Sequence, residues 1–346
     1  MCEMITDIDV LYNRHLLSRH QINTHFGFVD NTHPFQNEGI FQTVKAFSQI
    51  VDALQAEMID FIPLKGPVLS DLLYQDCSCR RFYDLDFVVD FEDVERFSNL
   101  LADLGYHPTK KWPVTPHKKE ALRLHTNQYL FEHRQNGTDV EIHWRLFTHY
   151  RFPDISFPKL YQDHTTPYTM NGRCLRKLSN ELELLFLLIH GATHTWYRLK
   201  WLVDVNDYIR NVAVDFDVLH DMAANNGFLR MLAYYNAIAK TYIPNACTIP
   251  GEKDGIPHYV RRHTDKEMRE EPLKKEDLPI GRKRNTLDVT DRYLTANYLA
   301  PDFFSRCIAT KYFISGLLPR KLILLLKPID PPLSYAIKKP FFRRAA

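Results

Sequence analysis

A short apolar run that carries two aspartates constrains the fold of this 346-residue chain more than any other feature. Residues 84–89 read Asp-Leu-Asp-Phe-Val-Val, a pattern typical of a buried strand. Side chains of a strand alternate between its two faces, so Asp84 and Asp86 lie on one face and Leu85 and Phe87 on the other. Two like charges side by side in a buried strand are unfavourable unless a positive charge lies close to both. The rest of the chain is therefore expected to supply that charge.

The segments around this strand predict alternating helices and strands. Residues 40–58 place apolar side chains at helical spacing, and residues 61–64 then read as a short strand. This strand ends in a turn at Lys65-Gly66, and residues 67–74 begin with a proline at a first helical position. Residues 94–106 predict a further helix that ends at a glycine.

The dipeptide Asn136-Gly137 lies between two strand-like runs and predicts a hairpin with a two-residue turn. That turn would set Glu132 opposite Glu141 and Leu130 opposite His143. Two facing carboxylates repel each other unless a cation is near, which makes Glu132 a weak candidate for a cation site. A bulge in the hairpin would change this register.

Alternation along the second strand of this hairpin brings three polar side chains to one face. Asp139, Glu141 and His143 share that face, while Val140 and Ile142 lie on the other. The apolar neighbours favour Glu141 as a residue of a buried site, and a surface position on the hairpin is the alternative.

From about residue 179 the pattern becomes helical. Ser179 is suited to an N-cap, and acidic residues follow it in the first turn. Residues 182–212 then predict a nearly unbroken helix with a weak point at Gly191, and residues 215–243 predict another. The charged residues 250–285, which are interrupted by Pro and Gly, predict a long loop or a partly disordered segment. We therefore expect a helical N-terminal extension over 1–38, an α+β domain over 39–178 and a helical domain over 179–346.

Composition narrows the class of protein. The net charge of +2 gives no argument for a nucleic-acid partner. The six cysteines form neither a disulfide framework nor a zinc motif, so we expect reduced thiols in a cytoplasmic protein without a secretory signal.

The most apolar late segment, residues 312–329, is interrupted by Pro319, Arg320 and Lys321, so it does not meet the requirement for a membrane-spanning helix. A buried terminal helix is the favoured interpretation. Peripheral contact with a membrane, helped by the basic tail 337–346, is the alternative.

Carboxylates on neighbouring strands suit divalent cations, which take oxygen ligands and bridge the phosphate oxygens of a substrate. Two such ions can stabilise the attacking and the leaving oxygen of an in-line displacement. The candidate ligands are Asp84, Asp86 and Glu141. The turn at Lys65-Gly66, which opens onto a helix N-terminus, would let backbone N–H groups and one ammonium contact a triphosphate.

The order of several motifs resembles a largely uncharacterised nucleotidyltransferase family of the DNA polymerase β-like superfamily, often found beside genes for polysaccharide and modified-peptide biosynthesis. The resemblance covers about residues 40–210, and each motif alone is weak while their order and number are fairly specific. The matching residues are Leu64-Lys65-Gly66, Arg80 with Asp84 and Asp86, His143-Trp144, and the helical set His190, His194, Trp196, Trp201 and Asp204.

The resemblance implies an α+β fold with a polymerase-β-like core, a mixed sheet with flanking helices, and a helical C-terminal portion. It implies that Asp84 and Asp86 hold Mg²⁺, with Mn²⁺ as a possible substitute. Glu141 would be the third ligand and the base or metal organiser. Lys65 and Gly66 would contact the triphosphate.

The resemblance does not fix the roles of Arg80, His143 and the pair His190 and His194. Arg80 would hold phosphate or pair with a nearby acid. His143 shares the face of Glu141 and is a candidate substrate contact. His190 and His194 have the spacing of zinc ligands on a helix, but packing or a hydrogen bond to Asp204 is favoured over zinc, with substrate contact as a further alternative.

We therefore expect a cytoplasmic, magnesium-dependent nucleotidyltransferase. It would move a nucleoside monophosphate from a nucleoside triphosphate, ATP favoured, to an unknown hydroxyl or phosphate acceptor and release pyrophosphate. The alternatives are a non-catalytic nucleotide-binding or scaffold module of a biosynthetic complex, and a toxin-type nucleotidyltransferase that acts on RNA or protein.

Overall fold

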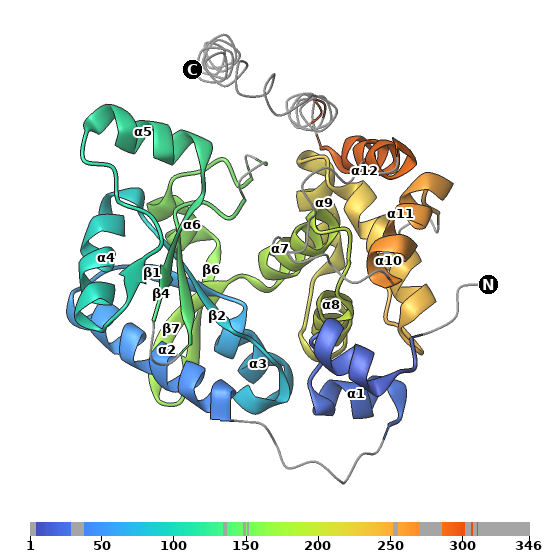
Figure 1. Ribbon diagram of the computed structural model, residues 1–346, viewed down its shortest axis with the longest axis horizontal. Helices are drawn as coiled ribbons and strands as arrows, with labels where there is room; N and C mark the ends of the chain where they lie inside the picture. The colour runs from blue at the N-terminus through green and yellow to red at the C-terminus, as the bar shows by residue number, and fades with distance from the viewer. Residues whose placement is uncertain are drawn as a thin grey trace.

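The computed structural model of the chain describes residues 5–28, 38–133, 137–147, 150, 152–251, 255–269 and 286–301, together with 306 and 310. A mixed five-stranded sheet with its flanking helices forms one portion of the molecule, on the left in Figure 1, and a group of helices forms the other, on the right. The expected α+β fold, with a mixed sheet, flanking helices and a helical C-terminal portion, is confirmed.

The double-aspartate run forms a central strand of this sheet. The strand order is β1-β2-β5-β4-β3, in which β2 and β5 are parallel and the other neighbours are antiparallel. The strands are β1 (Phe61–Leu64), β2 (Asp84–Val89), β3 (His107–Pro108), β4 (Gln128–Glu132) and β5 (Asp139–His143).

The two faces of the sheet belong to two hydrophobic cores. On one face Phe87 stacks on Phe47 of α2 (Glu38–Ala56) and meets Phe97 of α4 (Val94–Asp103) edge to face, with ring centroids 5.7 Å apart in both pairs. Burial of one such side chain contributes about 1.5–3 kcal/mol to the free energy of unfolding. On the other face Ile62 and Val88 belong to the core of the helical portion. The two portions thus share a core, and the domain boundaries near residues 39 and 179 stay a prediction.

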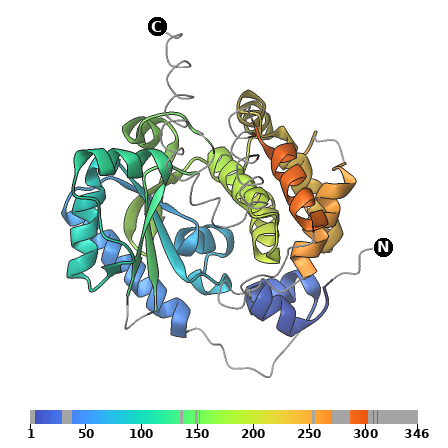
Figure 2. The same cartoon turned by 45° about the horizontal axis from the view of Figure 1, so that its top comes forward.

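The helical portion is built around α7, which contacts α8, α9, α10 and α12 (Figure 2). Its helices are α7 (Asn180–Thr193), α8 (Leu199–Asn211), α9 (Phe216–Asn225), α10 (Leu229–Tyr242), α11 (His258–Arg269) and α12 (Thr286–Leu299). The other elements are η1 (Val10–Arg14), α1 (Arg19–Phe26), α3 (Gly66–Tyr74), η2 (Cys77–Cys79), η3 (Phe91–Asp93), α5 (Pro116–His125), α6 (Phe157–Asp163), β6 (Thr165–Met170) and β7 (Arg173–Leu178).

The expected nearly unbroken helix over residues 182–212 is wrong, because the structure divides it into α7 and α8, and the division does not lie at the expected weak point Gly191. The helix α7 continues through Gly191, and the chain leaves helical geometry at Thr195 and Trp196, where φ is +53° and +54°. Gly191 has a packing reason instead: a Cβ there would lie 2.0 Å from Cζ3 of the buried Trp196 ring. The Trp side chain folds back against the helix and takes the space that a larger residue would need.

The expected register of the β4–β5 hairpin is also wrong. Glu132 lies opposite Asp139 and Leu130 lies opposite Glu141, a shift of two residues from a hairpin with a two-residue turn. The two strands end before the Asn-Gly dipeptide can close such a turn. Because a shift of two preserves the faces of a strand, Glu141 and His143 still lie on one face. Glu132 is exposed and lies away from Glu141.

Residues 250–285 are not a continuous loop. Residues 258–269 form α11, whose inner face buries Val260, His263, Thr264 and Met268. Few residues of that stretch are apolar, but those few have the spacing of one helix face. The apolar segment 312–329 lies outside the described residues. Among the residues described, no helix has the length and apolar character needed to span a bilayer.

Candidate active site

A cavity of about 770 Å³ lies between the sheet and the helical portion. One wall comes from β2 and β5, and the facing wall comes from α7 and the start of α8. All the site residues predicted from the sequence line this one cavity: Lys65, Gly66, Arg80, Asp84, Asp86, Glu141, His143, His190 and His194.

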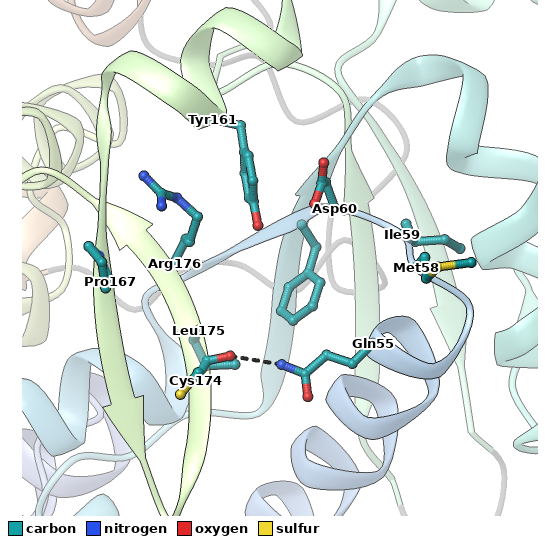
Figure 3. A pocket seen from close by; sticks show the side chains of 10 residues that line it. Gln55, Met58, Ile59, Asp60, Tyr161, Pro167, Cys174, Leu175 and Arg176 are labelled. Atoms are coloured by element: carbon teal, nitrogen blue, oxygen red, sulfur yellow. Dashed lines mark hydrogen bonds between the residues drawn. The ribbon is translucent and has the colours of Figure 1, made fainter.

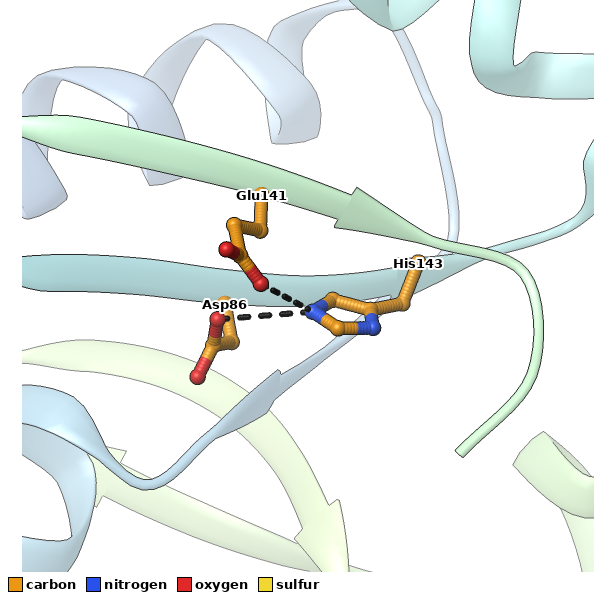
Figure 4. A group of neighbouring side chains, drawn as sticks. All are labelled: Asp86, Glu141 and His143. Carbon is orange, nitrogen blue, oxygen red and sulfur yellow. Dashed lines mark hydrogen bonds and ion pairs between the residues drawn. The ribbon is translucent and has the colours of Figure 1, made fainter. Parts of the chain in front are cut away.

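Asp84, Asp86 and Glu141 form an acidic wall of the cavity, and the pairing of β2 with β5 positions them. Asp86 on β2 is the register partner of Glu141 on the parallel strand β5, so their carboxylates meet on the cavity face. The His143 ring lies between them, with Nε2 3.3 Å from Asp86 Oδ1 and 3.3 Å from Glu141 Oε2 (Figure 4). The three side chains each offer a ligand atom, and these atoms lie within 4.8 Å of one another.

Two basic side chains supply the positive charge that the aspartates require. Lys65 Nζ lies 2.9 Å from Asp86 Oδ2, and His143 Nε2 contacts the other carboxylate oxygen, Asp86 Oδ1. Burial alone would raise the pKa of Asp86, but the charges of Lys65 and His143 hold it well below its ordinary value. Burial likewise would lower the pKa of His143, but its contacts with Asp86 and Glu141 raise it to about 9. The sequence predicted His143 only as a substrate contact and missed its position between the carboxylates.

Asp84 lies apart from this cluster. It is the exposed first residue of β2, and its register partner is Asp139. Burial raises the pKa of Asp139, and the neighbouring charges of Glu132, Asp84 and Glu141 raise it further. The structure therefore brings Asp86 and Glu141 together and leaves Asp84 at the open end of the same acidic wall.

The donor set fits a divalent cation. Asp86 and Glu141 offer hard oxygen ligands from adjacent strands, and Asp84 lines the same cavity. Carboxylate oxygens suit Mg²⁺ and Mn²⁺, and an imidazole is a further ligand that transition metals accept. Within the described part of the chain, Asp86, Glu141 and His143 form the one group of three metal-ligating side chains.

The turn after β1 has an unusual backbone. Lys65 and Gly66 have φ of +51° and +49°, and the helix α3 begins at Gly66 with a proline at its first turn. A Cβ at Gly66 would meet its nearest atoms at 3.9 Å, so the left-handed conformation rather than lack of space favours glycine there. Lys65, the N-cap residue of α3, contacts Asp86, so the N-terminus of this helix begins beside the carboxylates. The first backbone N–H groups of a helix have no partner within the helix itself.

Arg80 pairs with an acid of the helical portion. Its Nε and Nη2 donate to the two carboxylate oxygens of Asp204 on α8, at 2.7 and 2.8 Å. Both side chains are 2% exposed. Burial alone would lower the pKa of Arg80, but the Asp204 carboxylate raises it above its ordinary value. Of the two interpretations made from the sequence, the structure places Arg80 on the acid, and its Nη1 has no hydrogen-bond partner among the described residues.

The helical wall is aromatic. The rings of His190 and His194 lie 4.7 Å apart, and both contact the Trp201 ring, at 5.3 and 5.0 Å. Burial lowers the pKa of His190 well below its ordinary value, and the charge of Lys65 lowers it further. Asp204, the partner expected for these histidines, belongs to Arg80 instead. No third metal-ligating side chain joins the two histidines among the described residues, which favours packing over zinc.

Sequence reasoning missed Lys200. This residue of the first turn of α8 lines the cavity and is 8% exposed. Burial and the charge of Arg80 lower its pKa to about 7. A single lysine near a helix start has no distinguishing sequence signal, because its burial depends on how α8 packs against the loop before β2.

A second cavity of about 430 Å³ lies between the end of α2, β1 and the β6–β7 hairpin (Figure 3). Gln55 Nε2 donates to the Cys174 carbonyl oxygen across it, at 2.8 Å, and Arg176 lies near Tyr161. Its one carboxylate, Asp60, belongs to no group of metal-ligating side chains in the described chain. The larger cavity is therefore the candidate active site.

Known proteins are similar to the chain in sequence pattern and in part of the fold. No curated protein sequence matches it at a significant level. An antibiotic-resistance factor, ANT(2'')-Ia, is 11% identical over 54% of this chain and 91% of that chain, with a TM-score of 0.39. The lincosamide antibiotic adenylyltransferase LnuA, solved with lincomycin bound, is 18% identical over 47% of this chain and 94% of that chain, with a TM-score of 0.33.

An antigenic nucleotidyltransferase-like protein from Paracoccidioides brasiliensis is 18% identical over 56% of this chain and 89% of that chain, with a TM-score of 0.35. These structural scores are too low to assign the chain. The family described as "Uncharacterised nucleotidyltransferase" matches residues 37–244, which is more than half of the chain and includes every predicted site residue. The resemblance expected from the motifs is thereby confirmed, and the chain belongs to this family of nucleotidyltransferases.

Proposed function

We propose that the chain transfers a nucleoside monophosphate from a nucleoside triphosphate, ATP favoured, to a hydroxyl or phosphate acceptor, with a divalent cation and release of pyrophosphate. The observation that carries this proposal is the pairing of Asp86 with Glu141 on parallel strands, next to a left-handed turn that begins a helix. The family of the chain supports the same class of reaction.

In this reaction Asp86, Glu141 and Asp84 would hold Mg²⁺ or Mn²⁺. The cation would neutralise charge on the phosphate oxygens and align the attacking and leaving oxygens. Lys65 and the backbone N–H groups at the start of α3 would bind and orient the triphosphate. An acceptor oxygen would form a bond to the α-phosphorus as the bond to the bridging oxygen of pyrophosphate breaks.

The acceptor proton would pass to the acidic wall. Glu141 is the more exposed carboxylate of the cluster, at 24% against 5% for Asp86, so an acceptor in the cavity can reach it. The aromatic wall of His190, His194 and Trp201 faces that cavity and would exclude water from the acceptor. We expect the protein in the cytoplasm, consistent with free cysteines at 77, 79, 174 and 247.

The test is a transfer assay with each α-labelled nucleoside triphosphate, magnesium and a panel of sugars, sugar phosphates and antibiotics. Label should move to an acceptor with stoichiometric pyrophosphate, and Asp86→Asn should lower the rate at least about 1,000-fold. Asp103→Asn, at an exposed position on α4, is the matched control. Nucleotide binding without turnover in the wild type would contradict transfer and support a non-catalytic binding module.

A further inference from the structure

The ammonium of Lys200 is an unbalanced charge in the candidate active site. Lys200 is 8% exposed and lines the cavity. Among the described residues it has no hydrogen-bond or ion-pair partner. Two other basic side chains that line the cavity are paired with acids, Lys65 with Asp86 and Arg80 with Asp204. A buried ammonium without a partner is unfavourable, so the fold keeps it at a cost.

Arg80 adds a second unused donor to the same place. Its Nε and Nη2 donate to Asp204, while Nη1 is buried and has no hydrogen-bond partner in the part of the chain that the structure describes. Arg80 lines the cavity together with Lys200, and its charge is the strongest neighbouring influence on the pKa of Lys200. Lys200 and Asp204 are four residues apart on α8, so they share one face of that helix, and the Arg80 guanidinium held by Asp204 lies on the same side as Lys200.

We propose that Lys200 Nζ and Arg80 Nη1 form a subsite for a phosphate group of the substrate. A phosphate offers several oxygens and more than one negative charge, so it can accept from both groups at once. The phosphate would also compensate the positive charge of the Lys200 ammonium. The Asp204 carboxylate fixes the Arg80 guanidinium through two hydrogen bonds, which leaves Nη1 in a set direction before any ligand binds.

Two substrate groups have this chemistry. One is the terminal phosphate of the nucleoside triphosphate, and the other is a phosphate carried by the acceptor. The inference deepens the proposed function, because it rests on a nucleotidyl transfer taking place in this cavity. A phosphate subsite on the α8 side would add to the contacts already assigned to Lys65 and the α3 N-terminus.

The test is calorimetric titration of the metal-free protein with inorganic phosphate. The wild type should bind phosphate, and Lys200→Met should weaken that binding at least about tenfold, as loss of one charge-assisted hydrogen bond predicts. Lys240→Met, at an exposed lysine of α10, should bind as the wild type does. Lys200→Met removes an unpaired buried charge, so it should fold and melt at a temperature no lower than the wild type. Equal phosphate affinity in Lys200→Met and wild type, or no phosphate binding by the wild type, would overturn the proposal.

A second titration separates the two sources of phosphate. The wild type is first saturated with ATP and magnesium, and inorganic phosphate is then added. Loss of phosphate binding in the ATP-saturated protein assigns the subsite to the nucleotide, while unchanged phosphate binding assigns it to the acceptor. A protein that binds phosphate through Lys200 but transfers no nucleotide would contradict the proposed function alone, so the two failures are distinguishable.

Discussion

Asp86 is the residue on which the acidic wall depends. Its two carboxylate oxygens contact Lys65 and His143 from opposite sides, and its side chain is 5% exposed. Replacing one partner of a buried ion pair leaves the other charge without compensation. The residue is thus stable only as part of a set of charges.

Lys65→Met should test that dependence. We expect the free energy of unfolding to fall by about 3 kcal/mol in metal-free buffer, because Asp86 loses its closest positive partner. Added Mg²⁺ should recover part of the loss, since the cation can take the place of the ammonium. Urea unfolding with and without magnesium measures both effects, with Lys159→Met on the exposed side of α6 as the control. An unchanged stability in metal-free buffer would contradict this account of the site.

Gly191 makes a second residue-level prediction. A Cβ at this position would lie 2.0 Å from the Trp196 ring, which is fully buried. Gly191→Ala should therefore lower the free energy of unfolding by about 1–3 kcal/mol. Gly39→Ala, on a helix where an added Cβ meets nothing within 4 Å, should leave stability unchanged or raise it. Urea unfolding of the two variants compares them, and equal stabilities would show that Trp196 can move aside.

At the scale of elements, two Asn-Gly dipeptides show what a local signal can and cannot specify. Asn171-Gly172 closes a two-residue turn, with φ of +49° and +75°, and sets Met170 opposite Arg173. The same dipeptide at 136–137 follows a β4 strand that already ends at Glu132. The dipeptide is compatible with a two-residue turn, but the length of each strand depends on the sheet it joins.

The elements around the site were predictable because each has its own pattern. The strand at 84–89, the helix after Lys65-Gly66 and the helix from residue 180 follow from period and capping. The left-handed geometry at Thr195 and Trp196 was not predictable, because it depends on where the Trp ring packs. Lys200 reaches the cavity because α8 begins anew after α7 ends at Thr193. Its position was missed because the sequence predicted one continuous helix there.

His15 links the segment after η1 to the start of α8 and makes this junction sensitive to acid. Its Nδ1 accepts a hydrogen bond from the Leu199 backbone N–H at 3.1 Å. Burial lowers the pKa of His15 to about 3, and the charges of Arg14 and Arg198 contribute. Below pH 6.5 the unfolded chain therefore binds a proton that the folded chain does not, and stability falls as the pH is lowered from about 6.5 towards 3.

The expected loss is about 1.4 kcal/mol per pH unit from this one residue. In His15→Asn the amide oxygen can still accept the N–H of Leu199, but the titration is gone. Urea unfolding at several pH values between 7 and 4.5 should therefore give a shallower decline for the variant than for the wild type. Parallel declines would assign the acid sensitivity to other groups.

At the scale of the whole molecule, the sheet and the helices behave as one unit. Ile62 and Val88 of the sheet belong to the core that contains α7 and α8, and the Arg80–Asp204 pair joins the loop before β2 to α8. The site residues come from both portions, so the cavity depends on their staying docked.

We therefore expect the two portions to unfold together. Native-state hydrogen exchange should give backbone amides of β2 and of α8 similar opening free energies. Asp204→Asn should lower both by about 3–5 kcal/mol, because it leaves Arg80 buried with no opposite charge. A selective loss of protection in α8 would mean that the helical portion opens alone.

The contacts of Lys65 and His143 with the carboxylates bear on whether the protein needs a bound cation to fold. Together they already compensate the acidic pair, so the polypeptide can mature and persist without waiting for a cation. If the proposed reaction requires a divalent cation, the protein would stay folded in a cell where that cation is scarce rather than be degraded. The amount of protein would then depend on its rate of synthesis, and its activity would depend on the concentration of the cation. Adding the cation back would restore turnover without synthesis of new protein.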